Sequence, residues 1–133
     1  MQQLKRGKWR GFLVSNNLII KSTIILERDK LLIIPHEAVM RTSGVRGSLP
    51  IHELRSVMES RSPSPIEVSS SDVVSVNIYI VKKGWEKLRS MLPKEQAGSG
   101  RLAEVSVIAE GRDEVRLLTD EYTARKIRKA LAS

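Results

Sequence analysis

The chain has 133 residues and carries a formal net charge of +8 at pH 7. It contains no cysteine, which excludes disulfides, thiolate chemistry and cysteine-ligated zinc. No apolar run approaches the roughly 18–20 residues of a transmembrane helix, and no signal-peptide stretch follows the basic start. We therefore expect a soluble, cytoplasmic protein with one domain. Its charge favours anionic partners such as nucleic acid, acidic membrane surfaces or acidic protein faces.

The first residues form a basic arm. We assign residues 1–7 to this arm and 8–133 to a single domain. Basic side chains stand on both sides of Trp9 with no acidic residue among them, a composition that suits phosphates or anionic headgroups. A solvated terminus would have the same composition, so both interpretations stay open.

Short strand-like segments follow the arm. The pattern predicts strands over 9–15 and 18–27, joined by a turn at the Asn-Asn pair between them, because asparagine tolerates positive φ. A third strand is predicted over 31–34, ending at Pro35, and one helical turn over 36–40. Two adjacent hairpins follow from this order.

The middle of the chain alternates loops with short strands. A loop is predicted over 43–48, a short strand or turn over 49–51 that continues over 53–58, and a proline-containing loop over 61–65. Residues 73–81 alternate in part between apolar and polar side chains, as a half-buried strand does.

A short helix and a hairpin are predicted in the last third. Apolar residues at helical spacing predict a helix over 85–92, which Pro93 ends, and a flexible connection follows over 94–100. Residues 101–110 and 114–118 form a predicted hairpin around a glycine-containing turn.

The final helix has the charge order that its dipole prefers. Thr119 is the predicted N-cap, Asp120 and Glu121 occupy the first turn, and basic residues fill the second half. An apolar stripe on this helix should pack on the sheet. The stripe consists of Tyr122, Ile127, Ala130 and Leu131.

Strands followed by one closing helix indicate an α+β, mostly β fold. We expect a small antiparallel barrel or two-sheet half-barrel, closed by the C-terminal amphipathic helix. Domains of this kind are usually binding modules rather than enzymes.

The sequence lacks the patterns of catalytic and metal centres. His36 and His52 have no cysteine to join them, and the glutamate that follows each histidine points the other way on a strand. No serine stands in a Gly-x-Ser-x-Gly elbow, and residues 44–48 lack the lysine and the spacing of a phosphate-binding loop. We therefore expect no enzyme activity, no cofactor and no metal.

Charge clustering selects the candidate contact residues. We assign partner binding to Lys8 and Arg10 near the N-terminus and to Arg125 and Arg128 on the final helix. Each cluster could equally be a solvated face. If Lys8, Arg10 and Lys21 gather around one hairpin mouth, a phosphate or headgroup site is indicated, whereas an even spread favours protein docking or simple solubility. Aromatic residues are too few for stacking platforms that bind single-stranded nucleic acid.

The apolar spacing and the turns also resemble known families. Residues 11–17 through 31–34, with a terminal helix after a hairpin, look like pleckstrin-homology-like and GRAM-like domains. More narrowly, residues 49–57, a proline-containing loop and residues 72–76 are similar to the first half of the archaeal taxis protein F family, and residues 107–111 before the last helix fit it too. The resemblance implies an adaptor between the phosphorylated chemotaxis response regulator and the archaellum motor. Members of that family usually carry a second, similar domain.

Two functional hypotheses result. The first is a non-catalytic interaction or adaptor module that docks a protein partner in archaeal taxis or a related assembly, with a response regulator or a motor component as the implied partner. The second is a basic module that binds nucleic acid or anionic membrane headgroups. A structural subunit whose exposed sheet edge pairs with a partner strand is a third hypothesis.

Overall fold

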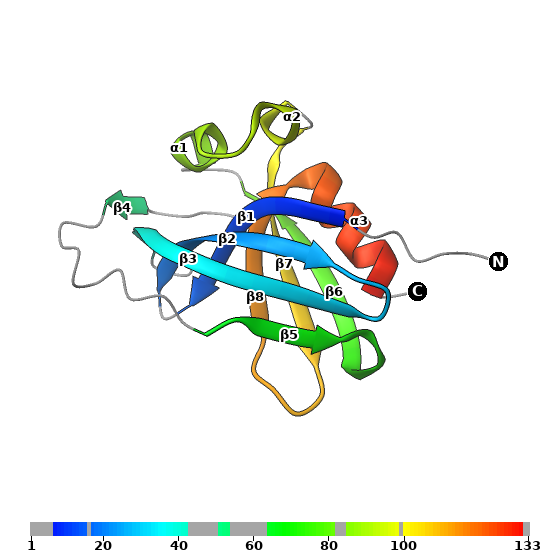
Figure 1. Cartoon of the computed structure of the whole chain (residues 1–133). Helices are drawn as coiled ribbons and strands as arrows, with labels where there is room; N and C mark the ends of the chain where they lie inside the picture. Colours follow the sequence, from blue (N-terminus) through cyan, green and yellow to red (C-terminus); the bar gives the residue numbers. More distant parts are fainter. Residues whose placement is uncertain are drawn as a thin grey trace.

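A single curled antiparallel sheet dominates the molecule (Figure 1). The computed structural model describes residues 7–15, 17–42, 51–53, 64–81, 85–98 and 100–131, and only the backbone at 42, 51–53, 85 and 97. Within these ranges, no helix is both long enough and apolar enough to cross a bilayer. The expected mostly β half-barrel with a C-terminal helix is confirmed.

Seven of the eight strands lie in the order β4-β3-β2-β1-β8-β7-β6. The eighth, β5, also pairs with β3, over residues 30–33, whereas β4 pairs with β3 over 40–42. The strands are β1 (Gly7–Ser15), β2 (Leu18–Leu26), β3 (Lys30–Thr42), β4 (Ile51–Glu53), β5 (Ile66–Ser69), β6 (Val73–Ile80), β7 (Leu102–Ala109) and β8 (Val115–Asp120). The helices are η2 (Ser70–Asp72), α1 (Trp85–Ser90), α2 (Lys94–Ala97) and α3 (Glu121–Leu131), where η2 is a single 3-10 turn. Helix α3 contacts β6, β7 and β8 on the concave face of the sheet.

All three predicted hairpins form, as β1–β2, β2–β3 and β7–β8. The β1–β2 hairpin turns at Asn17, whose φ of 64° is the left-handed conformation that asparagine tolerates. The β7–β8 hairpin turns at Gly111, with φ of 75°. The alternating segment predicted as a strand over 73–81 is β6, which ends at Ile80.

The third strand is longer than predicted. β3 continues without interruption past Pro35 to Thr42, so the predicted strand end and the helical turn over 36–40 are both wrong. Pro35 pairs with Ser22 next to a register shift between Ile20 and Ser22. An irregularity of this kind tolerates a residue that cannot donate a ladder hydrogen bond. Pairing with β2 on both sides of Pro35 therefore overrides the local preference of the segment.

Three other segments differ from the prediction or extend it. The segment at 66–69 is strand β5, which was not predicted, and its pairing with residues 30–33 of β3 is what makes it a strand. The connection predicted over 94–100 contains helix α2, which begins directly after Pro93. The helix predicted over 85–92 is present but ends at Ser90.

Several predictions lie partly or wholly outside the described residues. They are the basic arm apart from Gly7, the loop over 43–48, the strand over 49–51 and 53–58 apart from Ile51–Glu53 of β4, and the start of the loop over 61–65.

The start of α3 differs from the predicted cap. The Asp120 carboxylate Oδ2 accepts a hydrogen bond from the Thr123 backbone N–H at 2.9 Å, so Asp120 rather than Thr119 is the N-cap. The predicted apolar stripe is also wrong at Tyr122, which is 55% exposed. Ile127 is fully buried, as predicted.

Two apolar clusters lie on opposite faces of the sheet. The cluster on the concave face joins the strands to α3, and it includes Leu13, Ile24, Ile33, Val105, Leu117, Ala124 and Ile127. The cluster on the convex face joins the strands to α1 and the turn after it, and it includes Phe12, Val14, Ile19, Met40, Leu88, Leu92 and Leu118. The two clusters explain why β1 is apolar on both faces over 11–14.

Candidate functional site

The three basic residues singled out in the sequence share the convex face of the sheet. In the β1–β2 ladder, Lys21 pairs with Phe12, whose ring belongs to the convex cluster. Lys8 and Arg10 precede Phe12 at intervals of two, and residues at this interval share one face of a strand. The register therefore places Lys8, Arg10 and Lys21 together.

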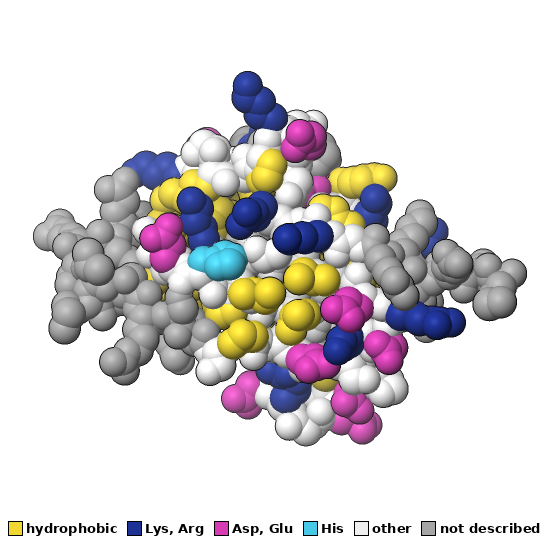
Figure 2. Space-filling model, viewed as in Figure 1, with side chains coloured by type: hydrophobic (Ala, Val, Ile, Leu, Met, Phe, Trp, Pro, Cys, Tyr) yellow, Lys and Arg dark blue, Asp and Glu magenta, His cyan; other side chains and the backbone are white. Residues whose placement is uncertain are grey.

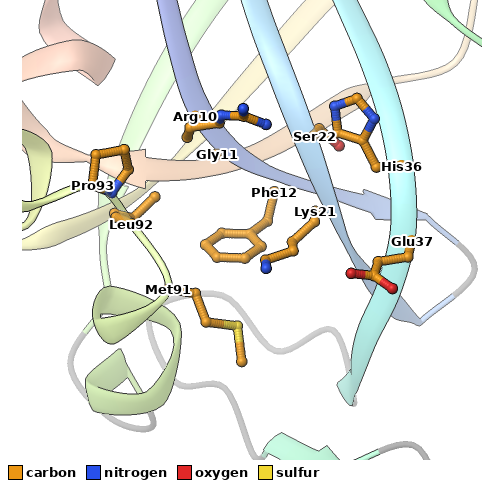
Figure 3. A pocket seen from close by; sticks show the side chains of 10 residues that line it. All are labelled: Arg10, Gly11, Phe12, Lys21, Ser22, His36, Glu37, Met91, Leu92 and Pro93. Atoms are coloured by element: carbon orange, nitrogen blue, oxygen red, sulfur yellow. The ribbon is translucent and has the colours of Figure 1, made fainter.

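Arg10 and Lys21 line one cavity of about 440 Å³ over β1, β2 and β3 (Figure 3). Its floor is the sheet, and one wall is the turn after α1. The lining residues are Arg10, Gly11, Phe12, Lys21, Ser22, His36, Glu37, Met91, Leu92 and Pro93. We call this cavity the basic pocket. Its volume lies within the range of small-molecule sites, roughly 300–1,000 Å³.

The Thr23 hydroxyl links the side chains of Arg10 and His36 on one side of the pocket. Thr23 Oγ1 lies 2.8 Å from His36 Nε2 and 3.5 Å from Arg10 Nη1. The hydroxyl can accept from the guanidinium and donate to a neutral imidazole, or accept from a protonated one. Figure 3 shows the Arg10 guanidinium extended toward the His36 ring. The link leaves the other guanidinium N–H groups available for a ligand.

Four basic side chains at or beside the basic pocket have no carboxylate partner among the described residues. Neither Lys8, Arg10, Lys21 nor His36 forms an ion pair with any described part of the chain. Figure 2 shows basic side chains grouped beside the histidine, with hydrophobic side chains directly below them. Glu37 contributes a carboxylate to the pocket lining but pairs with none of these cations. An anion in the pocket would therefore not have to displace an existing salt bridge.

The backbone of Arg10 is held by a side chain distant in sequence. Gln96 Oε1 accepts from the Arg10 backbone N–H at 2.9 Å, and Gln96 Nε2 donates to the Arg10 carbonyl oxygen at 2.8 Å. The same Nε2 donates to Asp120 Oδ1 at 2.9 Å. β1 pairs with β8 only over 12–14, so the amide of Gln96 takes the place of a neighbouring strand at Arg10.

The wall of the pocket is anchored by buried leucines. Leu88 of α1 is fully buried and Leu92 is 6% exposed, and both belong to the convex cluster together with Phe12. Met91 packs against the same cluster from the pocket side. The short α1–α2 unit is therefore held in place by apolar contacts, and its position defines one side of the basic pocket.

A second hollow lies beside the pocket. It has a volume of about 330 Å³ and shares Arg10 and Pro93 with the basic pocket. Its other lining residues are Lys8, Trp9, Glu95 and Gln96. Lys8 thus borders the same surface as Arg10 and Lys21 without lining the basic pocket itself.

The two other candidate residues, Arg125 and Arg128, lie on α3, the helix of the concave face. Arg125 Nη2 lies 2.6 Å from Glu121 Oε2, and Arg101 Nε lies 3.2 Å from Glu121 Oε1. Hydrogen bonds from Arg125 and then Arg101 lower the pKa of Glu121 from its ordinary value of 4.5. Arg128 is exposed. The four candidates therefore divide between two surfaces rather than forming one site.

The geometry adds residues that sequence reasoning missed. His36 is one of them, and it lines the same pocket as Lys21 because β2 and β3 form a hairpin. Thr23 and Gln96 position Arg10 through its side chain and its backbone. Charge clustering in the sequence already indicated Arg10, whereas nothing in the sequence indicates Gln96.

Metal-binding groups do not gather among the described side chains: no cluster of three His, Cys, Asp or Glu residues occurs there. The site therefore presents hydrogen-bond donors and positive charge rather than a ligand set. Comparison of the chain with protein-family models finds no match. Comparison with curated protein sequences finds none either.

Proposed function

We propose that this protein is a non-catalytic interaction module that docks a protein partner on its convex face, with an anionic group of the partner held in the basic pocket. One observation carries the proposal: Arg10, Lys21 and His36 line one cavity and have no carboxylate partner in the described chain.

The pocket offers the donors that an anion needs. A guanidinium can donate two parallel N–H bonds to a carboxylate or phosphate, and a lysine ammonium adds a point charge. Part of the lining is apolar, from Phe12, Met91 and Leu92, which lowers the local dielectric and strengthens such bonds.

The fold proposed for this module is pleckstrin-homology-like. A meander of β1, β2 and β3, the short strands β4 and β5 that pair with β3, three further strands and a closing helix support this assignment. The further proposal of an adaptor in archaeal taxis, with a response regulator or a motor component as the partner, rests on the sequence resemblance alone.

The second candidate function is binding of nucleic acid or anionic membrane headgroups through the same pocket. The grouping of Lys8 with Arg10 and Lys21 favours it, because each cation can neutralise one phosphate. Exposed carboxylates on the same face oppose it: Glu37 lines the pocket, and the Glu67 side chain is 59% exposed. An extended polyanion would meet both signs of charge.

The test is a titration of the ¹⁵N-labelled protein with inorganic phosphate at low salt, in which changes in the amide chemical shifts are measured. We expect shifts at Arg10, Lys21 and His36. The double variant Arg10→Gln/Lys21→Gln should lose them. The control Arg125→Gln/Arg128→Gln, which also removes two positive charges, should keep them. Equal losses in both variants, or shifts confined to α3, would overturn the proposal.

Two further probes separate the partner classes. A short DNA duplex and anionic vesicles are each titrated at low and at near-physiological salt. Binding to phosphates should weaken by roughly one logarithmic unit per tenfold salt for each phosphate neutralised. Tight binding of either probe that persists at near-physiological salt would favour the second candidate function.

A further inference from the structure

Three apolar side chains lie on the convex face beside the basic pocket. Ile25 of β2 and Leu32 and Ile34 of β3 are half-buried, and they belong to neither apolar cluster of the molecule. Ile25 pairs with Leu32, and Thr23 pairs with Ile34, so the three apolar side chains lie side by side. We call them the apolar strip. Figure 2 shows hydrophobic side chains in the open just below the histidine.

The strip continues the ladder rows that carry the cations. Lys8 pairs with Ile25, which pairs with Leu32, which pairs with Glu67 of β5. One row of the convex face therefore runs from a cation through two apolar residues to a carboxylate. The Glu67 carboxylate is already held by Lys30 Nζ at 2.9 Å. Lys8, at the other end of the row, has no ion-pair partner among the residues that the structure describes.

From this arrangement we infer that the convex face binds an acidic amphipathic helix of a partner protein, with its acidic side chains at the basic pocket and its apolar side chains on the strip. This inference rests on the proposed function, and it adds the chemistry and the conformation of the docked segment.

The helical conformation follows from the position of the strip within the sheet. At the row of Ile25 and Leu32, β2 is paired on both edges and β3 is paired with both β2 and β5. An extended segment could not add to the sheet here, so its backbone groups would have no ladder partner. A helix satisfies its own backbone bonds. Its side chains at i and i+4 lie about 5–6 Å apart, close to the spacing of about 4.8 Å between neighbouring strands.

Charge selects an acidic segment rather than a lipid surface. A helix carrying carboxylates on one side can place them near Lys8, Arg10 and Lys21 while keeping them away from Glu67. A flat anionic membrane would bring negative charge to the whole face, including the exposed Glu37 and Glu67. The strip is also set into the sheet rather than on a protruding loop, which suits a helix better than a bilayer.

The experiment uses three synthetic helical peptides and the whole protein. The parent peptide carries Glu on one side and Leu at i and i+4 on the adjoining side. The second peptide replaces Leu with Ser, and the third replaces Glu with Gln. We expect the parent to bind at least about tenfold more tightly than either, as measured by fluorescence anisotropy at near-physiological salt.

A matched pair of protein variants locates the contact. Leu32→Thr/Ile34→Thr alters the strip, and Val74→Thr/Ile108→Thr alters two exposed apolar residues of β6 and β7 outside it. We expect the strip variant to lose about tenfold in affinity for the parent peptide and the control variant to lose none. The phosphate titration should be unchanged in both, because neither alters the basic pocket. If the strip variant folds poorly, the amide chemical shifts that the parent peptide causes in the unaltered protein locate the contact instead.

The outcomes separate this inference from the proposed function. If phosphate shifts the pocket amides but the Leu side chains add no affinity, the amphipathic helix is the wrong occupant and the anion site stands. If phosphate has no effect on the amide shifts of Arg10, Lys21 and His36, the proposed function is overturned, and the inference that rests on it is overturned as well. Anionic vesicles that bind at near-physiological salt more tightly than the parent peptide would also overturn the inference.

Discussion

The side-chain amide of Gln96 makes two hydrogen bonds to the backbone of Arg10, one to its N–H and one from Nε2 to its carbonyl oxygen. This relationship joins a short helix to the strand that carries the pocket. Because these two bonds hold the Arg10 backbone in place, they also set the position from which the Arg10 side chain extends toward His36. The pocket therefore depends on a residue that does not line it.

The first prediction concerns this bond pair. Gln96→Leu keeps the volume of the side chain but removes three hydrogen bonds. These are the bonds of the Gln96 amide to the Arg10 backbone N–H, to the Arg10 carbonyl oxygen and to Asp120 Oδ1. We expect a loss of about 1–3 kcal/mol in the free energy of unfolding and weaker phosphate shifts at Arg10. Urea unfolding and the phosphate titration measure the two effects. Glu95→Gln, at the exposed neighbour, is the control and should behave as wild type.

The second prediction concerns the cap of α3. Asp120→Ala removes the acceptor for the Thr123 N–H, and we expect a loss of about 0.5–2 kcal/mol in unfolding free energy. Asp120→Asn keeps an acceptor for the Thr123 N–H but not for Gln96 Nε2, and should recover part of that loss. Thermal unfolding followed by circular dichroism distinguishes the variants. Equal stability of the Ala variant and wild type would show that the cap contributes little.

The third prediction concerns close packing at Gly11. A Cβ atom there would lie 2.5 Å from Ile24 Cδ1 and 2.7 Å from the Leu118 carbonyl oxygen, and the backbone oxygen cannot easily move away. We expect Gly11→Ala to cost about 1–3 kcal/mol of unfolding free energy. Gly98→Ala is the matched control, since its Cβ would come no closer than 3.4 Å to the Lys94 carbonyl oxygen. Chemical denaturation of both variants checks the difference.

The fourth prediction concerns the wall of the pocket. Leu88 is fully buried in the convex cluster, so Leu88→Ala should create a cavity and cost about 2–5 kcal/mol. Met91 and Pro93 follow Leu88 closely and line the pocket, so we also expect the phosphate shifts there to change. Leu88→Met, which conserves volume better, should retain both properties.

The fifth prediction concerns pH. The pKa of Glu121 is lowered in the folded protein by Arg125 and Arg101, so the charged carboxylate stabilises the fold above its ordinary pKa of 4.5. That contribution is lost as the pH falls through the lowered pKa. We expect Glu121→Gln to flatten the fall in stability measured by urea unfolding from about pH 7 to about pH 3. Glu110→Gln, at an exposed turn residue, should leave the curve unchanged.

The sequence alone determined the elements whose signals are local. The asparagine turn after β1, the glycine turn after β7 and the alternation along β6 are properties of neighbouring residues, and each predicted the element found. The acidic start and basic end of α3 predicted the helix for the same reason. Its exact cap was missed because Thr119 and Asp120 both suit the position, and the choice depends on where β8 stops pairing.

Tertiary pairing decided the rest. Residues 36–40 and 66–69 are strands because β2 and β3 offer them partners, which local sequence does not record. The basic pocket arises likewise, since only the register of β1, β2 and β3 brings Arg10, Lys21 and His36 to one cavity. Charge content predicted an anionic partner, but the separation of Arg125 and Arg128 from Arg10 required the fold. Side chains distant in sequence meet through hydrogen-bonded strands, and that pairing is a property of the folded chain.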